Sequence, residues 1–218
     1  MRSYGVSHIG LVRKVNEDSF YCQENYEYGK PYLCIVADGM GGHNAGEIAS
    51  KMAVSEIEKY IYEALKNSVG YKLDDYKNLV KDAFLFANKA VYNRSRENMD
   101  CSGMGTTLTL ALIVENNLII GHVGDSRMYL KKGEKLSRIT EDHSYVAELI
   151  KNGTIKPEEA NHHPQKNLIT RALGTSSDLE VDIKSITVDN GDFILMCTDG
   201  LSNMLSDDEI LNTIISFK

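Results

Sequence analysis

Residues 33–39 read LCIVADG, an apolar run that ends in an Asp-Gly pair. Two later stretches repeat the arrangement, IIGHVGD at 119–125 and FILMCTDG at 193–200. Runs this apolar are typical of strands buried on both faces, so each is expected to carry an aspartate to the end of a core strand. The three aspartates are Asp38, Asp125 and Asp199.

An Asp-Gly pair alone most often makes only a tight turn. Three carboxylates that converge in a protein interior must instead be neutralised by protons, by cationic side chains or by a metal ion. A ligand set made only of oxygen atoms suits a hard cation, Mg²⁺ or Mn²⁺. The repeated pattern therefore favours a divalent-metal site where these strands end, with a set of simple turns as the alternative.

The spacing of apolar residues predicts the fold class. Between residues 47 and 91 they recur three and four positions apart, which indicates two amphipathic helices, 47–65 and 76–91. Short runs rich in β-branched and aromatic residues indicate blocks of consecutive strands on both sides of these helices. This order favours antiparallel sheets with helices outside them over a βαβ parallel sheet, so the expected class is α+β. The expected strands span residues 4–10, 19–23, 31–37, 106–114, 118–124, 127–131, 179–188 and 193–198.

Three local patterns refine this outline. Asn116 and Asn117 are expected to form a hairpin turn between two of the strands, because Asn tolerates positive φ. Residues 145–151 are expected to form a short helix. Ser206 and Glu209 are spaced as a capping box at the start of a last helix.

Composition places the chain among globular proteins. Hydrophobic residues make up 42% and charged residues 25% of the 218 residues, so a single domain over 1–218 is expected. The net charge of -7 argues against a nucleic-acid partner, which needs a basic surface. No apolar stretch approaches the ~20 residues that cross a bilayer, so membrane insertion is not expected. The four cysteines form no Cys-x-x-Cys pair, which favours a reduced, cytoplasmic protein over a zinc or disulfide framework.

Further polar residues are candidates for the same site. Arg13 offers a planar fork for phosphate, and Glu17 and Asp18 offer more carboxylate oxygens, although this run could also be a solvated turn. His43 stands at a helix entrance and is a candidate proton donor, against the commoner structural role of a lone histidine. His162 lies in a polar loop, where a surface position is the simpler interpretation.

Two familiar motifs are excluded by their spacing. The glycine-rich stretch 38–47 has Asn44 where a dinucleotide-binding loop needs glycine, and Glu47 where a phosphate-binding loop needs lysine. Ser126 has Met128 where a hydrolase nucleophile elbow needs glycine. Neither nucleotide binding nor a serine nucleophile is therefore supported.

Taken together, seven short motifs resemble the metal-dependent protein phosphatases of the PPM (PP2C) family in their bacterial form. They run in the family's order across nearly the whole chain, and seven in register exceed what chance produces. The motifs are Arg13-x-x-Asn16-Glu17-Asp18, VADGMGGH at 36–43, GEIAS at 46–50, GMGTT at 103–107, GDSR at 124–127, ITRALG at 169–174 and TDG at 198–200.

The resemblance implies a four-layer αββα sandwich, in which two antiparallel sheets are flanked by helices and two metal ions lie at one end. By this likeness Asp38 would bridge the metals, and the Gly39 carbonyl would bind one of them. Asp199 would hold the other metal. Glu17 and Asp18 would be ligands directly or through water.

The resemblance also assigns roles to residues around these ligands. Asp125 matches a position that, with Asp199, holds a third metal in bacterial members. Arg13 would bind the substrate phosphate, and His43 matches the proposed general acid. Residues 142–171 correspond to a flap beside the active site, so that His162 would contact substrate.

The implied activity is that of a protein serine/threonine phosphatase that uses Mn²⁺ or Mg²⁺. A hydroxide bridging the two metals would attack phosphorus directly, with no phosphoenzyme. The expected partners are phosphoprotein substrates, including a bacterial Ser/Thr kinase whose action the enzyme opposes.

One departure from the family pattern leaves alternatives open. The family carries a further Asp, in an Asp-Asn pair on a strand after the Asp199 motif, whereas no such pair follows Asp199 here. The chain is therefore expected to lack that C-terminal strand. The alternatives are a truncated, inactive or partner-specific regulatory member of the same fold, as in sigma-factor control, and a non-catalytic metal-binding interaction domain.

Overall fold

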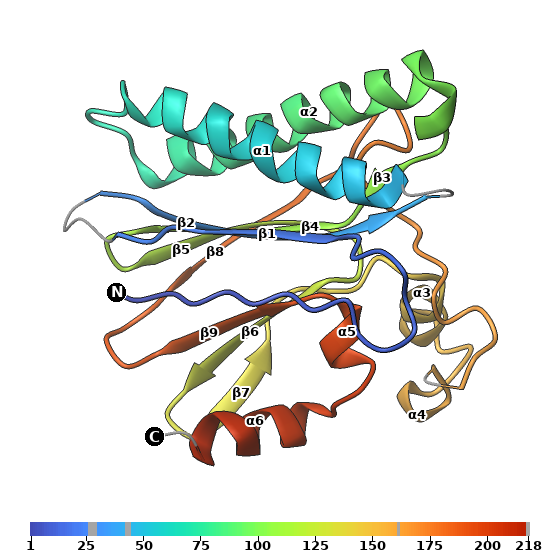
Figure 1. The fold of residues 1–218 in the computed structure, drawn as a ribbon. Coiled ribbons are helices and arrows are strands. Elements are labelled where there is room, and N and C mark those ends of the chain that lie inside the picture. Colours follow the sequence, from blue (N-terminus) through green and yellow to red (C-terminus); the bar gives the residue numbers. More distant parts are fainter. Residues whose placement is uncertain (26–29, 42–44, 161, 217–218) are drawn as a thin grey trace.

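Two antiparallel sheets lie face to face, with helices on the outer side of each (Figure 1). The computed structural model describes residues 1–25, 30–41, 45–160 and 162–216. The first sheet has the order β1 (Asp18–Cys22), β2 (Tyr32–Met40), β4 (Leu108–Val114), β5 (Asn117–Val123) and β8 (Asp182–Thr187), with the short β3 (Gly105–Thr106) paired to β2. The second sheet has the order β7 (Lys135–Arg138), β6 (Arg127–Lys132) and β9 (Phe193–Cys197).

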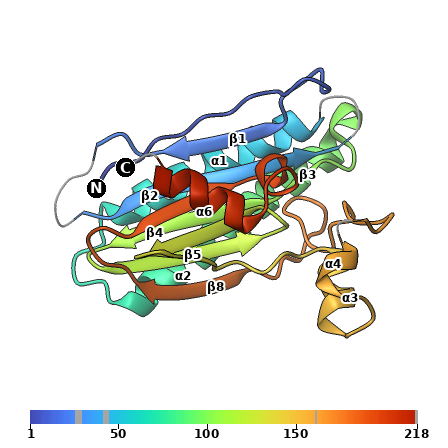
Figure 2. The ribbon, with the colours of Figure 1, turned by 90° about the horizontal axis from the view of Figure 1, so that it is seen from below.

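The helices form the outer layers and one projection. Helices α1 (Ala45–Leu65) and α2 (Leu73–Glu97) cover the first sheet, whereas α6 (Asp207–Ser216) lies across the outer face of the second (Figures 1 and 2). The arrangement confirms the expected α+β sandwich of four layers. The remaining helices are the 3-10 turn η1 (Met99–Cys101), α3 (Tyr145–Lys151), α4 (Pro157–Ala160) and α5 (Asp199–Ser202).

The largest core lies between the first sheet and helices α1 and α2. Alternate residues of β2, namely Leu33, Ile35 and Ala37, are almost completely buried against the helices. The apolar stripe of α2 includes Phe84, which is 0% exposed and packs beside β5. This period of two in the strands and of 3.6 in the helices is what the sequence pattern predicted.

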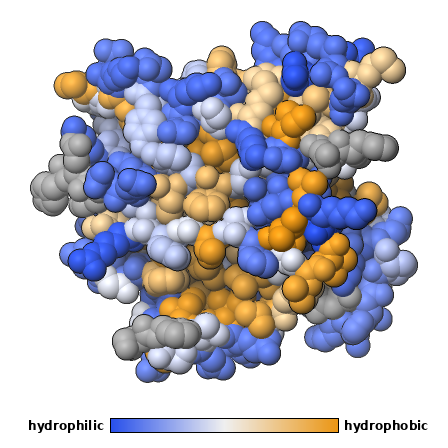
Figure 3. All heavy atoms as spheres, viewed as in Figure 1, coloured by the Kyte–Doolittle hydropathy of each residue, from blue (hydrophilic) through white to orange (hydrophobic). Residues whose placement is uncertain are grey.

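A second, smaller core fills the space between the two sheets. Its fully or nearly buried members are Tyr32, Ala111, Ile113, Leu118, Ile120 and Met128. On the side of β9 this layer is open: Phe193 is 45% exposed, and Figure 3 shows apolar residues gathered on this face at the level of β9 and α6. The expectation that the strand before Asp199 is buried on both faces is therefore wrong.

Most of the elements expected from the sequence are present, although η1, α4 and α5 were not predicted and four further points differ. Residues 4–10 form no strand, because no described strand pairs with them, and Tyr4 is 91% exposed. The hairpin turn lies at Glu115 and Asn116, with Glu115 at φ 53°, so Asn117 already belongs to β5. Asp38 lies inside β2 and not after it, and β7 was not predicted.

The capping box is confirmed, since the Ser206 backbone N–H donates to Glu209 Oε2 at 2.8 Å and the Glu209 N–H donates to Ser206 Oγ at 3.3 Å. The cysteines are free thiols, and those of Cys22 and Cys34 face each other across β1 and β2 at 3.9 Å. Among the described residues, no helix is both long and apolar enough to cross a membrane.

Candidate active site

Two of the predicted carboxylates face each other across neighbouring strands. Asp18, the first residue of β1, pairs with Asp38 of β2 in the antiparallel register. The Asp38 backbone is held on its other side, where its N–H donates to Thr107 Oγ1 and its carbonyl accepts from the Thr107 N–H, both at 2.9 Å. Like charges placed directly opposite each other destabilise a sheet, so this pair indicates a function and not a structural contribution.

The second sheet brings two more aspartates to the same end of the sandwich. Asp199 is the first residue of α5, directly after β9, and Asp125 lies in the turn between β5 and β6. The two sheets are joined here by Thr198, whose hydroxyl donates to Asp18 Oδ2 at 3.0 Å. Four carboxylates that are far apart in the sequence are therefore close enough to influence one another's ionisation.

Burial and mutual repulsion raise the pKa values of this group. Burial, followed by the charges of Asp18, Asp199 and Asp125, raises the pKa of Asp38 to about 8. Burial and then the charge of Asp199 raise the pKa of Asp125 to about 6. Burial likewise raises the pKa of Asp18, against the hydrogen bond from Thr198. A cluster of this kind is stabilised by added positive charge.

Two glycines let helix α1 approach the acidic strands. A Cβ atom on Gly46 would lie 2.5 Å from Glu17 Oε1 and 2.8 Å from the backbone carbon of Gly39. The Gly39 N–H in turn donates to the Glu17 carbonyl at 3.0 Å. The close approach of these three residues brings Glu17 to Gly39, the residue that follows Asp38.

Arg13 lies at the open side of this acidic group. Its Nη1 is 3.6 Å from Glu17 Oε2, and its side chain is 76% exposed. Arg13 borders a cavity of about 1450 Å³, which is also lined by Glu17, Asp18, Asp38 and Asp199. Because the Arg13 guanidinium is exposed beside this cavity, it can bind an anion without breaking a buried contact.

Not every predicted residue is brought to this cavity. His43 lies outside the described residues, so its role stays a prediction. His162 is exposed, and the part of 142–171 that lines the cavity is Lys166 and Asn167 instead. Asp125 is near the other carboxylates but is not among the residues that line the cavity.

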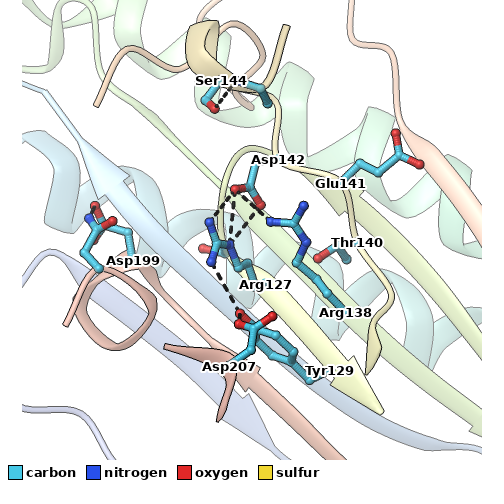
Figure 4. Close-up of polar contacts among 12 residues, drawn as sticks. Arg127, Tyr129, Arg138, Thr140, Glu141, Asp142, Ser144, Asp199 and Asp207 are labelled. Atoms are coloured by element: carbon cyan, nitrogen blue, oxygen red, sulfur yellow. Dashed lines mark hydrogen bonds and ion pairs between the residues drawn. The ribbon is translucent and has the colours of Figure 1, made fainter. Parts of the chain in front are cut away.

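A polar cluster beside Asp125 was not predicted from the sequence. Arg127 binds Asp142 through Nε at 3.1 Å and through Nη2 at 2.7 Å, and Arg138 reaches the same carboxylate at 3.3 Å (Figure 4). Buried Tyr129 donates from its hydroxyl to Asp207 at 2.9 Å. Nothing in the local sequence indicates the Arg127–Asp142 and Tyr129–Asp207 contacts, because they join residues that are 15 and 78 positions apart.

The donor chemistry of the site fits a hard divalent cation. Its side-chain donors are carboxylate oxygens, and their raised pKa values show that a cation would relieve their repulsion. Among the described residues, no three His, Cys, Asp or Glu side chains are gathered tightly enough to be a complete ligand group. The fit therefore rests on the oxygen donors and on their electrostatics.

Comparison with known proteins agrees with this site. The chain matches a family described as protein phosphatase 2C over residues 4–217. The "serine/threonine phosphatase stp" of Listeria monocytogenes serotype 4b is 39% identical over 202 residues, which are 92% of this chain and 78% of the relative.

Solved structures show the same architecture. The Mycobacterium tuberculosis serine/threonine phosphatase PstP/Ppp has a TM-score of 0.84 at 38% identity, over 96% of this chain and 83% of that chain. A catalytic domain of PstP in complex with two manganese ions has a TM-score of 0.81 at 36% identity, over 96% of this chain and 82% of that one. The match along the sequence and these likenesses in structure place the chain in the protein phosphatase 2C family.

Proposed function

We propose that the acidic end of the sandwich hydrolyses phosphoserine and phosphothreonine in proteins. The chain is a metal-dependent protein serine/threonine phosphatase with Mn²⁺ or Mg²⁺ as cofactor, because its family and its named relatives agree on this activity. The observation that carries the assignment to this site is the mutual repulsion of Asp18, Asp38, Asp125 and Asp199, which calls for divalent cations.

The ligands in this proposal are the residues that the motifs indicated. Asp38 would be a ligand of both metals, with the Gly39 carbonyl and Asp199 as further ligands. Glu17 and Asp18 would complete the set, directly or through water. Cations held there would lower the pKa of a bound water and stabilise the attacking and leaving oxygens of an in-line displacement.

A third metal is assigned to Asp125 together with Asp199. The support is that Asp199 is the charge with the largest effect on the pKa of Asp125, after burial. This ion would be held by a residue of the turn between β5 and β6, which approaches the cluster from a different direction than β1 and β2.

Other residues of the chain act on the substrate. Arg13 binds the phosphate from the open side of the cavity, where its guanidinium is exposed. His43 gives a proton to the leaving oxygen. Residues 142–171 form a flap beside the cavity, and His162 of this flap meets the rest of the phosphoprotein. Support for the flap comes from α3 and α4, which project from the same end of the sandwich as α5 (Figure 1).

The cellular setting follows from the activity. The substrates are phosphoproteins, and we assign to the chain a cytoplasmic location in which it opposes a Ser/Thr kinase. A partner-specific regulatory member of the same fold would share the metal site but would ignore unrelated phosphopeptides, and a non-catalytic domain would bind metal without turnover.

The test is Mn²⁺-dependent phosphate release from a phosphothreonine peptide. Asp38→Asn should lower turnover by at least about 100-fold, because it removes the bridging carboxylate. Asp74→Asn, on the exposed start of α2, is the matched control and should keep wild-type turnover. Equal turnover of the two variants would refute the site, whereas Mn²⁺ binding without turnover by the wild type would favour the partner-specific or non-catalytic alternative.

A further inference from the structure

His143 lies at the base of the proposed flap and holds the turn that carries Asp125. Its backbone N–H donates to the Gly124 carbonyl at 2.8 Å, and its ring Nδ1 accepts from the Gly124 N–H at 3.1 Å. Both backbone groups of Gly124 are therefore bound by this one residue. Gly124 directly precedes Asp125, so these two hydrogen bonds help to fix the orientation of Asp125.

The conformation of Gly124 explains why such support is needed. Gly124 has φ +108°, and a Cβ atom there would lie 2.6 Å from Thr107. Glycine is the most flexible residue in the unfolded chain and gains no packing of its own side chain. The hydrogen bonds with His143, which is only 7% exposed, therefore help to hold this turn in place.

The contacts of the ring define its tautomer. A backbone N–H can only donate, so Nδ1 is the acceptor and Nε2 carries the proton of the neutral ring. That proton faces Asp182 of β8, whose Oδ2 lies 3.3 Å from Nε2. Burial and the nearby Arg171 charge lower the pKa of His143, which keeps the ring neutral at pH 7. Arg171 binds the other oxygen of Asp182 at 3.1 Å.

The same residue joins the two ends of the segment 142–171. The Thr170 N–H donates to the His143 carbonyl at 2.9 Å. The next residue, Ser144, forms an isolated antiparallel bridge with Ile169. The outgoing and returning chains of the flap therefore meet at His143.

We propose that His143 is a positioning residue that fixes the Asp125 turn through Nδ1 and couples it to the base of the flap. The proposal rests on the proposed function, in which Asp125 binds a metal. A displacement of the flap base is transmitted through His143 to Gly124, and so changes the placement of one metal ligand without touching Asp38 or Asp18.

The neighbouring ion pair supports the turn from its other side. Asp142 binds Arg127, which follows Asp125 by two residues (Figure 4). Asp142 thus fixes the start of β6, whereas His143 fixes the residue before Asp125. Glu141 takes no part, since its side chain is 69% exposed, pairs with Lys184 at 3.5 Å and points away from Asp142 in Figure 4.

Three substitutions at one position separate the role of Nδ1 from that of the whole ring. His143→Asn keeps an acceptor near the position of Nδ1, His143→Gln keeps a donor near that of Nε2, and His143→Ala keeps neither. Hydrogen–deuterium exchange of the metal-free protein is measured on peptides that cover residues 118–128. Exchange should be about ten-fold faster in the Ala and Gln variants, because the hydrogen bond to Nδ1 is lost. In the Asn variant, which keeps an acceptor, exchange should stay within about two-fold of the wild-type rate.

Mn²⁺ binding supplies the second measurement. Calorimetric titration of the wild type and of Asp125→Asn identifies the ion that depends on Asp125. Its dissociation constant should rise about ten-fold in His143→Ala and His143→Gln and stay near the wild-type value in His143→Asn and in the control Glu141→Gln. The affinity for the remaining ions should not change in any of these variants.

Two results would overturn the proposal. One is wild-type exchange at residues 118–128 in His143→Ala; the other is a loss of protection, or of Mn²⁺ affinity, that is equal in His143→Asn and His143→Ala. If Asp125→Asn removes no Mn²⁺, the failure lies in the proposed metal set, while the exchange measurement still decides whether His143 fixes the turn. Thermal unfolding in the presence of chelator identifies any variant that does not fold. If His143→Ala does not fold, the comparison is made between the Asn and Gln variants.

Discussion

The two sides of the sandwich are built differently. On the first side, β4 and β5 are buried along nearly their whole length beneath α1 and α2. On the second side, β9 is only partly buried, and polar contacts such as that of Tyr129 with Asp207 join its neighbours to α6. The first side is thus held mainly by apolar packing, and the second depends more on hydrogen bonds between specific groups.

The candidate active site lies where these two kinds of structure meet. Asp18 and Asp38 belong to the well-packed sheet, whereas Asp199 follows the partly buried β9. Thr198 connects the two sides by its hydrogen bond to Asp18. The first sheet therefore holds Asp18 and Asp38 in a well-packed framework, whereas Asp199 is held by the less buried second side.

The largest effect is expected from removing a core side chain on the first side. Phe84→Ala should lower the free energy of unfolding by about 3–5 kcal/mol, because Phe84 is 0% exposed and the cavity cannot be filled by its neighbours. Ile194→Ala on β9 should cost only about 1–2 kcal/mol, since this residue is already partly exposed. Chemical denaturation measures both, and equal losses would contradict the contrast between the two sides.

A smaller loss is expected from adding a methyl group where the first sheet meets α1. Gly46→Ala should cost about 3 kcal/mol despite the better helix propensity of alanine, because its Cβ would lie 2.8 Å from backbone of Gly39. Gly200→Ala is the matched change on the second side, where the nearest atom is 3.6 Å away. In thermal unfolding, Gly200→Ala should be as stable as the wild type or slightly more stable. A Gly46→Ala variant of wild-type stability would show that α1 can move away from the sheet.

The smallest of these effects concerns a titratable group between the sheets. His122 is 1% exposed and contacts Thr109 and the Glu141 carbonyl at 2.9 and 3.0 Å. Burial, followed by the nearby His143, lowers its pKa to about 4. The unfolded chain therefore binds more protons than the folded one below pH 6.5, and stability from this group is lost as the pH falls towards 4.

The measurement compares the wild type with His122→Gln in chelator. Between pH 7 and pH 5 the wild type should lose about 2 kcal/mol relative to the variant, with the contributions of the carboxylates cancelling in the difference. Parallel pH profiles of the two proteins would mean that the pKa of His122 is the same in the folded and the unfolded protein.

The fold was largely predictable because its elements have clear periodicity. Helix α3 begins and ends at the predicted residues, and the long helices differ only at their ends. The segment 4–10 has the apolar alternation of a strand, but a strand also needs a partner, and pairing is not a property of the local sequence. The short β7, with few apolar residues, offered no pattern to detect.

The sequence predicted the acidic residues that the structure gathers, but not the contacts that position them. Asp38, Asp125 and Asp199 follow the same local pattern, and the structure brings them close enough for Asp199 and Asp125 to raise the pKa of Asp38. Thr198 acts through one long-range hydrogen bond and His143 through two with Gly124, and such contacts leave no trace in residue spacing. The role of His162 as a substrate contact stays a prediction, and the residues of 142–171 that line the cavity are Lys166 and Asn167.

The order of the strands has a consequence for synthesis on the ribosome. Apart from Leu173, every fully buried member of the large core lies at or before Val123, so this core can assemble while the rest of the chain is still being made. Asp18 and Asp38 are then placed early, and Asp199 joins them only after β8 has closed the first sheet and β9 has been translated. The nascent protein thus passes part of its elongation with only part of this acidic cluster assembled.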